Sequence, residues 1–141
     1  MYIKKDDLTI VIVTFESDEV IFDCLNSIDE EINIIIVDNS NNFNLKNLIE
    51  QKYKNIKYIL SSKNLGMGTG NNLGIKNVKT NFALILNPDV ILEGDTINEL
   101  IKGSKLLKDF AILAPISSNK KYPNYKLFKK KHISIDEPFK V

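Results

Sequence analysis

Short apolar runs alternate with amphipathic segments along this chain, and this alternation restricts its fold more than any other feature. The runs are rich in β-branched residues; four are strong and one is weak, and they cover residues 8–13, 32–37, 56–60, 82–86 and 111–114. Such runs, without polar alternation, are typical of strands that are buried on both faces. The alternation therefore predicts an α/β fold of βαβ units, with an open, mostly parallel sheet and helices on both faces.

Four helices are expected beside these strands, because apolar residues recur there at a helical spacing. The first follows a Ser17-Asp18 capping signal and places Cys24 on its apolar face, where it is expected to belong to the core. The second lies around residues 45–53, the third covers 71–78 and the fourth covers 97–107.

Composition narrows the class of protein. The length of 141 residues fits one domain, and 43% hydrophobic with 26% charged residues is ordinary for a globular chain. A formal net charge of +1 provides no basic field, so we expect no nucleic-acid partner. The single cysteine allows no intrachain disulfide. No apolar run approaches the roughly 20 residues of a membrane span, and the N-terminus lacks a signal-peptide core, which together predict a cytoplasmic protein.

The end of the chain differs from the rest. We expect a domain over residues 1–116 and a lysine- and aromatic-rich tail over 117–141. Lys129, Lys130 and Lys131 can contact phosphates or a membrane surface, so peripheral membrane association stays open. A solvated linker is the favoured interpretation of this tail, and His132 is expected to be a surface residue.

Candidate site residues stand where the predicted strands end, because open parallel sheets bind ligands outside the carboxyl ends of their strands. The first strand is followed by Thr14, Phe15 and Glu16, and the second by Asp38. Phe15 can stack on a nucleobase or fill the core. Asp38 can accept hydrogen bonds from a ligand, or it can begin an Asx-turn.

A glycine-rich segment, NLGMGTGNNLG over residues 64–74, follows the third strand. Several of its residues favour positive φ or a close approach of the backbone: Gly66, Gly68, Gly70, Asn71 and Asn72. We expect a loop over residues 64–70 whose amides face an anion at the start of the third helix. The alternative is a simple tight turn between strand and helix.

Asn87-Pro88-Asp89 closes the fourth strand. Pro88 ends the sheet pairing and fixes φ, so Asp89 projects from a rigid corner. A rigid carboxylate beside a pyrophosphate suits Mg²⁺ or Mn²⁺, which accept one or two carboxylates plus substrate phosphates. A structural Pro-Asp turn is the alternative.

Taken together, TIVIVTFES, IIIVDNS, NLGMGTGNNLGI and FALILNPDV resemble the family 2 glycosyltransferases, especially their rhamnosyltransferase-like branch. The resemblance covers residues 8–115 and implies a Rossmann-like nucleotide-binding domain of the GT-A type. It implies a donor site made of residues from all four strand ends: Thr14, Phe15, Glu16, Asp38, Asn64, Gly66, Asn72, Asn87 and Asp89.

Roles within this site also follow from the resemblance. The three residues after the first strand would line the nucleoside pocket, and Asp38 would hold the base or ribose. Asn64, Gly66 and Asn72 would pack under the donor. Asn87-Pro88-Asp89 takes the place of the family's Asp-x-Asp motif, which leaves Asp89 as the metal ligand.

The implied activity is sugar transfer from a nucleotide-diphospho-sugar, with UDP- and dTDP-sugars (dTDP-rhamnose among them) as candidate donors. The implied acceptor is a glycan or lipid-linked molecule in cell-surface polysaccharide synthesis, and the implied cofactor is Mg²⁺ or Mn²⁺. Family members continue into a second half that supplies the acceptor site and the general base. We therefore expect a truncated, N-terminal half whose acceptor half a second subunit can supply.

No catalytic base is assigned. The remaining carboxylates near or beyond the metal motif stand in no recognisable base motif: Glu93, Asp95, Asp109, Asp136 and Glu137. A catalytically incomplete nucleotide-sugar-binding module is therefore the main alternative to an enzyme. A dinucleotide-dependent oxidoreductase is disfavoured, because its glycine fingerprint belongs in the first βα turn and residues 14–18 contain no glycine.

Overall fold

The computed structural model describes residues 3–107 and 110–115. The chain divides into two compact units, of which the larger spans Ile3–Leu92 and the smaller continues from Glu93. The predicted tail over 117–141, including His132, lies outside the described residues, so the predicted boundary at 116 stays a prediction. No helix in the described part of the chain is long and apolar enough to cross a membrane.

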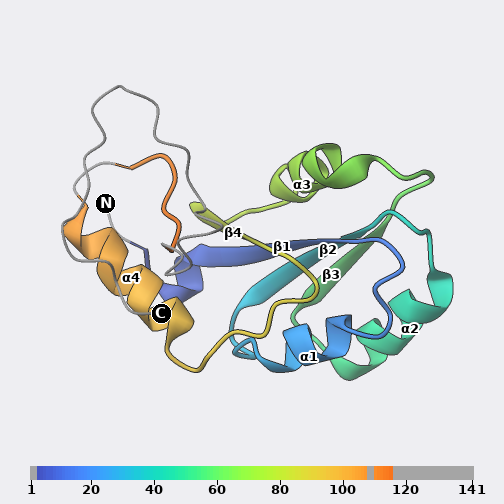
Figure 1. Ribbon diagram of the computed structural model, residues 1–141, viewed down its shortest axis with the longest axis horizontal. Coiled ribbons are helices and arrows are strands. Elements are labelled where there is room, and N and C mark those ends of the chain that lie inside the picture. Colours follow the sequence, from blue (N-terminus) through green and yellow to red (C-terminus); the bar gives the residue numbers. More distant parts are fainter. Residues whose placement is uncertain (1–2, 108–109, 116–141) are drawn as a thin grey trace, which may run out of the picture. The chain divides into compact units, whose positions relative to one another are not determined.

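The larger unit alternates strands and helices as the apolar pattern predicts (Figure 1). It contains η1 (Lys5–Asp7), β1 (Leu8–Thr14), α1 (Ile21–Asn26), β2 (Asn33–Asp38), α2 (Phe43–Lys52), β3 (Ile56–Leu60), α3 (Gly66–Ile75) and β4 (Phe82–Leu86). The smaller unit contains α4 (Thr96–Leu106).

The four strands form one parallel sheet in the order β3-β2-β1-β4. The chain adds β2 and β3 on one side of β1 and then returns to place β4 on the other side. Since βαβ crossovers are right-handed, this reversal requires α3 to cover the face opposite to α1 and α2, and Figure 1 shows that arrangement. The reversal also makes the carboxyl ends of β1 and β4 the expected ligand-binding crevice.

The core lies on both faces of the sheet, which confirms the predicted open parallel α/β fold with helices on both sides. On the α3 face, Val11, Ile35 and Val37 form a buried cluster with Leu73 of α3 packed against it. The alternate residues of β1 and β2 point to the face that α1 and α2 cover, and Ile10, Ile12, Ile34 and Ile36 are buried there. Cys24 is buried in α1, as expected for a core residue.

The start of α1 differs from the prediction. The helix begins at Ile21 after Val20, whose side chain makes no capping hydrogen bond. Ser17 and Asp18 have other partners: the Ser17 hydroxyl bonds to the Phe15 peptide, and Asp18 Oδ1 accepts from Asn42 Nδ2 at 2.8 Å. The predicted cap is therefore wrong, because both polar side chains fix the loop that precedes the helix.

The glycine-rich segment also differs from the prediction. It forms α3 from Gly66 onward, whereas a loop was expected as far as residue 70. Only Gly66 among its residues has positive φ, at 71°. Gly70 and Gly74 instead face β1, where an added Cβ would lie 2.8 Å and 2.3 Å from methyl groups of Val13 and Val11. These two glycines serve the close packing of helix on sheet.

The weak fifth strand is absent. Residues 111–114, which lie within the described part of the chain, have no helix or strand assignment. The run AILA is short and has little β-branched character, so it lacks the property that marked the four true strands.

Candidate functional site

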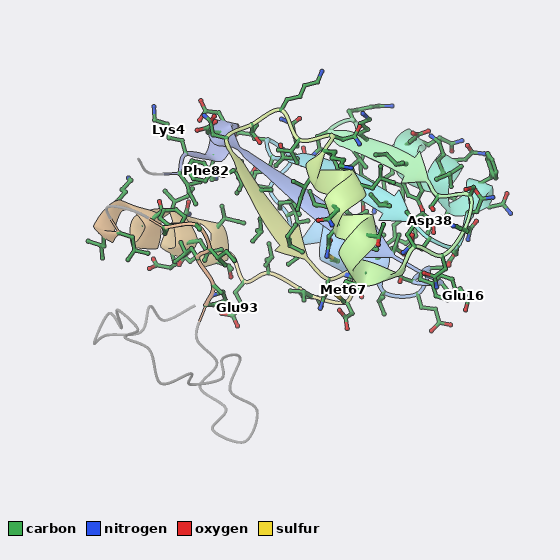
Figure 2. The ribbon with its side chains drawn as sticks, turned by 90° about the horizontal axis from the view of Figure 1, so that it is seen from above. Lys4, Glu16, Asp38, Met67, Phe82 and Glu93 are labelled. Atoms are coloured by element: carbon green, nitrogen blue, oxygen red, sulfur yellow. The ribbon has the colours of Figure 1, made fainter. Side chains whose placement is uncertain are left out.

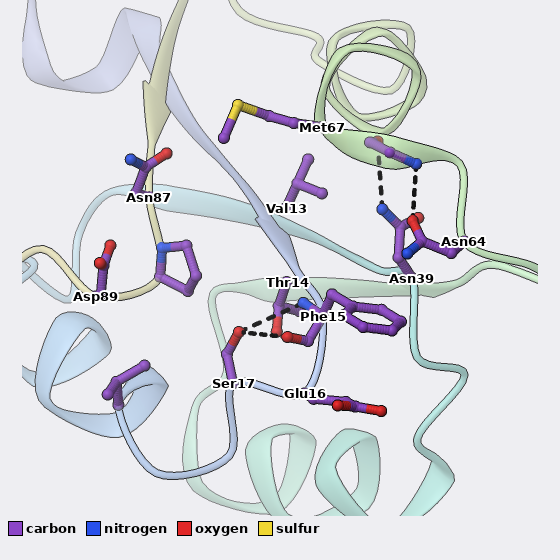
Figure 3. Close-up of a pocket in the computed structure, with 13 residues that line it drawn as sticks. Val13, Thr14, Phe15, Glu16, Ser17, Asn39, Asn64, Met67, Asn87 and Asp89 are labelled. Carbon is purple, nitrogen blue, oxygen red and sulfur yellow. Dashed lines mark hydrogen bonds between the residues drawn. The ribbon is translucent and has the colours of Figure 1, made fainter.

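A pocket of about 600 Å³ lies at the carboxyl ends of β1 and β4 and the start of α3. Figure 2 shows that Glu16, Asp38 and Met67 lie toward one end of the sheet, opposite Lys4 and Phe82. The side chains labelled in Figure 3 come from the end of β1, the first turn of α3 and the segments that follow β1, β2, β3 and β4. The pocket is lined by Val13, Thr14, Phe15, Glu16, Ser17, Val20, Asn39, Asn64, Gly66, Met67, Asn87, Pro88 and Asp89.

The structure thus brings most of the predicted site residues together. Thr14, Phe15, Glu16, Asn64, Gly66, Asn87 and Asp89 all line this one pocket. Asp38 and Asn72 do not line it. Asn72 is an exposed residue within α3, and its predicted contact with a donor stays a prediction.

The loop after β1 forms one wall. Phe15 is 48% exposed, which rules out the alternative that it fills the core and leaves its ring available for stacking. The Ser17 hydroxyl donates to Phe15 O at 3.2 Å and fixes the loop below the ring (Figure 3). Glu16 has φ of 50°, a left-handed conformation that is uncommon for a residue with a side chain and often marks functional loops.

Thr14 lies at the base of this wall and is 1% exposed. Its Oγ1 has no hydrogen-bond partner among the described residues. A buried hydroxyl without a partner costs free energy. This oxygen is therefore a polar group whose hydrogen bonds a ligand or a water molecule can complete.

Asn39 joins two elements of the pocket and was not predicted as a site residue. Its Nδ2 donates to Gly66 O at 3.3 Å, and its Oδ1 accepts from Leu65 N at 3.4 Å. Asn64 Oδ1 in turn accepts from Gly66 N at 2.8 Å (Figure 3). These bonds hold the first turn of α3 against the end of β2, so the glycine-rich segment has a fixed position beside the pocket.

The segment after β4 forms the opposite wall, and it carries Asn87 and Asp89 as predicted. Cys24 Sγ donates to Asn87 O at 3.6 Å. Burial and the nearby Asp89 carboxylate raise the pKa of the Cys24 thiol to about 11. The thiol is therefore protonated near neutral pH and able to donate this hydrogen bond.

The residues present fit a divalent cation only in part. The described residues contain no group of three or more His, Cys, Asp or Glu side chains that could hold a metal ion. Asp89 offers one carboxylate and Asn87 one neutral amide oxygen, and both line the pocket. Hard cations such as Mg²⁺ and Mn²⁺ bind about six oxygen ligands, so the remaining ligands would have to come from a bound phosphate group or water.

Asp38 has a different environment from the one expected. It is fully buried, and both carboxylate oxygens accept hydrogen bonds from its own chain. Oδ1 accepts from Ser40 N at 2.8 Å and from the Ser40 hydroxyl, and Oδ2 accepts from Asn42 N at 2.8 Å and Tyr58 OH at 3.1 Å. The Asx-turn, which was the alternative interpretation, is therefore present, whereas the predicted contact with a base or ribose stays a prediction.

Tyr58 completes this buried pair. Burial, followed by the Asp38 carboxylate, raises the pKa of the Tyr58 hydroxyl well above its usual range. The hydroxyl is therefore protonated near neutral pH and able to donate to Asp38. The pair fixes the end of β2, from which Asn39 enters the pocket.

Comparison with known proteins gives a family for this arrangement. The sequence model of glycosyl transferase family 2 matches residues 9–139. A curated relative, the low-salt glycan biosynthesis hexosyltransferase Agl10 of Haloferax volcanii, is 34% identical over 99 residues, which cover 67% of this chain and 32% of Agl10. The chain thus spans about a third of the length of that relative.

Solved structures show the same fold. TarS 1–349 of S. aureus in complex with UDP has a TM-score of 0.57 at 22% identity, over 66% of this chain and 30% of that one. The mannosyltransferase PcManGT from Pyrobaculum calidifontis, in complex with GDP-Man and Mn²⁺, has a TM-score of 0.58 at 14% identity, over 64% of this chain and 30% of that one. At these identities the likeness establishes the fold.

Proposed function

The chain belongs to glycosyl transferase family 2, and we propose that its pocket binds the nucleotide diphosphate of a sugar donor for transfer to an acceptor. The observation that carries the proposal is the pairing, in one pocket at the β1–β4 crevice, of an exposed aromatic ring with a carboxylate. Phe15 provides a stacking surface for a base, and Asp89 provides a ligand for a cation that accompanies the diphosphate.

Different residues of the pocket bind different parts of the donor. Phe15 and the unpartnered Thr14 hydroxyl receive the nucleoside, and the fixed first turn of α3 lies beside the phosphates. Asp89, aided by Asn87, would hold Mg²⁺ or Mn²⁺. When bound, the cation supplies positive charge that stabilises the departing nucleotide diphosphate. The chain's own contribution is to bind the donor and orient it.

The donor is proposed to be a UDP- or dTDP-sugar, with dTDP-rhamnose a candidate, and the acceptor a glycan or lipid-linked molecule of a cell-surface polysaccharide. The glycan biosynthesis role in the name of Agl10 and the UDP in the TarS complex support this class. A cytoplasmic or membrane-associated location and a second subunit that supplies the acceptor half belong to the same proposal.

A second candidate is a donor-binding module without catalysis of its own. The pocket's only carboxylates among the described residues are Glu16 and Asp89. The family resemblance implies that Glu16 lines the nucleoside pocket, and Asp89 is the proposed metal ligand. No further carboxylate there is placed to deprotonate an acceptor hydroxyl. Donor binding without sugar transfer by this chain would support the module; transfer would support the enzyme.

Replacing Asp89 by asparagine should remove the coupling between metal and nucleotide. In the wild type, Mn²⁺ is expected to tighten UDP or dTDP binding about tenfold, since couplings of roughly 1–3 kcal/mol are typical. Linkage makes this effect reciprocal, and Asp89→Asn should abolish most of it. The test is calorimetric titration of the nucleotide with Mn²⁺ and with chelator.

The matched control is Asp6→Asn, which removes an exposed carboxylate from η1 before the start of β1. It should retain the full Mn²⁺ effect. Equal nucleotide affinity in the wild type with and without Mn²⁺ would show that Asp89 closes a structural turn, and the metal assignment would then be withdrawn.

Truncating Phe15 to alanine should weaken nucleotide binding about 5- to 150-fold, because stacking of a base on an aromatic ring contributes about 1–3 kcal/mol. The loss should appear equally with Mn²⁺ and with chelator. Phe43→Ala is the control, since Phe43 is 62% exposed at the start of α2 and does not line the pocket. Unchanged affinity in Phe15→Ala would place the base elsewhere.

A further inference from the structure

The segment that carries Asp89 has little regular structure to hold it. Residues 87–92 follow β4 and form neither helix nor strand. Asn87 and Asp89 are both exposed, and within the segment Val90 N donates to Asn87 O at 3.3 Å. A ligand-binding carboxylate must be held close to its productive position, so this segment needs support from another element.

Helix α1 supplies that support at two points. Cys24 Sγ donates to Asn87 O at 3.6 Å, before Asp89 in the chain. Ser27 Oγ accepts from Leu92 N at 3.0 Å, after Asp89. The two contacts therefore bracket the carboxylate, and both start from the same end of one helix.

Helix α1, from which both contacts come, is packed firmly into the core. Cys24 is fully buried, and the α1 residues Ile21 and Leu25 are 0% and 2% exposed. Ser27 closes the helix, because its amide donates to carbonyl groups of the last turn. Because α1 is packed into the core, hydrogen bonds to this helix hold the segment after β4 in a fixed position.

The Ser27 hydroxyl makes two bonds at once. It donates to Cys24 O at 2.6 Å and accepts from Leu92 N at 3.0 Å. A serine or threonine hydroxyl can donate one hydrogen bond through its proton and accept another at its oxygen. Alanine would lose both bonds, whereas threonine retains the groups that make them.

We propose that Cys24 and Ser27 are positioning residues that hold Asp89 at the donor pocket by fixing the segment after β4 on α1. Neither residue lines the pocket, so they act through the segment and not by contact with the donor. The inference rests on the proposed role of Asp89 in metal-dependent nucleotide binding, and its test must separate the two.

The test compares wild type, Ser27→Ala and Ser27→Thr by two measurements. The first is residue-resolved amide exchange by NMR in the nucleotide-free protein. Ser27→Ala should speed exchange of the Leu92 amide about fivefold, with the β1 amides unchanged, because one hydrogen bond is lost locally. The second is the gain in UDP affinity on addition of Mn²⁺, which should fall from about tenfold in the wild type to about threefold in Ser27→Ala and recover in Ser27→Thr.

Affinity for UDP in chelator should be equal in all three proteins, since the Phe15 side of the pocket is untouched; loss of this affinity would show a general structural role and overturn the proposal. Unchanged exchange at Leu92, or faster exchange with an undiminished Mn²⁺ gain, would also overturn it. If the wild type binds UDP without any Mn²⁺ gain, the metal role of Asp89 fails and the positioning role falls with it. If the wild type binds no nucleotide, the proposed function itself fails.

The Cys24 contact is tested in the same way. Cys24→Ala should lower the Mn²⁺ gain, as Ser27→Ala does, and Cys24→Ser, which keeps a hydrogen-bond donor, should lower it less.

Discussion

Replacing Asp38 by alanine is expected to lower the free energy of unfolding by about 3 kcal/mol, one of the two largest effects that we predict for a single substitution. The side chain is fully buried and accepts four hydrogen bonds, two of them from backbone amides and one from the buried Tyr58 hydroxyl. Alanine would leave these donors without an acceptor in a place that water reaches poorly. Each such donor costs roughly 1–3 kcal/mol, reduced where the loop relaxes.

Urea unfolding followed by circular dichroism measures this loss. Tyr58→Phe is the matched comparison, because it removes one of the four donors and keeps the carboxylate; it should cost about 1 kcal/mol. Nucleotide affinity should be measured on the folded fraction of Asp38→Ala. A mutant with wild-type stability and abolished nucleotide binding would support the role in holding a base or ribose that the family resemblance implies, and would show that the Asx-turn contributes little to stability.

The difference between Asp38 and Asn39 explains why the sequence identified one residue and missed the other. Successive side chains of a strand point to opposite faces, so a shift of one residue changes the face completely. Asp38 shares the face of Ile34 and Ile36 and bonds to Tyr58 of β3, whereas the next residue reaches Gly66 and lines the pocket. A run buried on both faces carries no alternation from which that choice can be made.

Strand positions were predictable because they depend on local composition. The runs at Ile56–Leu60 and Phe82–Leu86 become strands with the predicted bounds, since contiguous β-branched and aromatic residues suit a buried parallel sheet. The pocket followed from the rule that ligands bind at the carboxyl ends of such strands, which placed Phe15 and Asp89 on opposite walls of one cavity.

Helix α3 was less predictable because its glycines have a tertiary cause. Glycine is a poor helix former, so local propensity favours a loop over residues 66–70. The helix forms there because Gly70 and Gly74 let it approach Val13 and Val11, residues far away in sequence. That contact sets the position of Gly66 and Met67 at the pocket, and no pattern within the segment itself indicates it.

Gly74→Ala should therefore lower the free energy of unfolding by about 2 kcal/mol, although alanine is the better helix former. The added Cβ would lie 2.3 Å from Val11 Cγ1 and 3.4 Å from Val37 Cγ2. Both valines are fully buried and belong to the cluster beneath α3, so they have no solvent into which to move. Either the Val11 side chain must rotate or α3 must move away from β1.

Gly68→Ala on the same helix provides the control, because its Cβ would meet nothing within 4 Å. It should leave stability unchanged or raise it by up to about 1 kcal/mol, as expected from helix propensity alone.

Val11→Ala removes the methyl groups that the Cβ of Gly74→Ala would meet. The loss of unfolding free energy in the double variant should therefore be about 1 kcal/mol smaller than the sum of the two single losses. Urea unfolding of these four variants and of the wild type measures the losses. Additive losses, or equal effects at positions 68 and 74, would mean that α3 does not depend on close contact with β1, and the first turn of α3 would then owe its place at the pocket to the Asn39 hydrogen bonds alone.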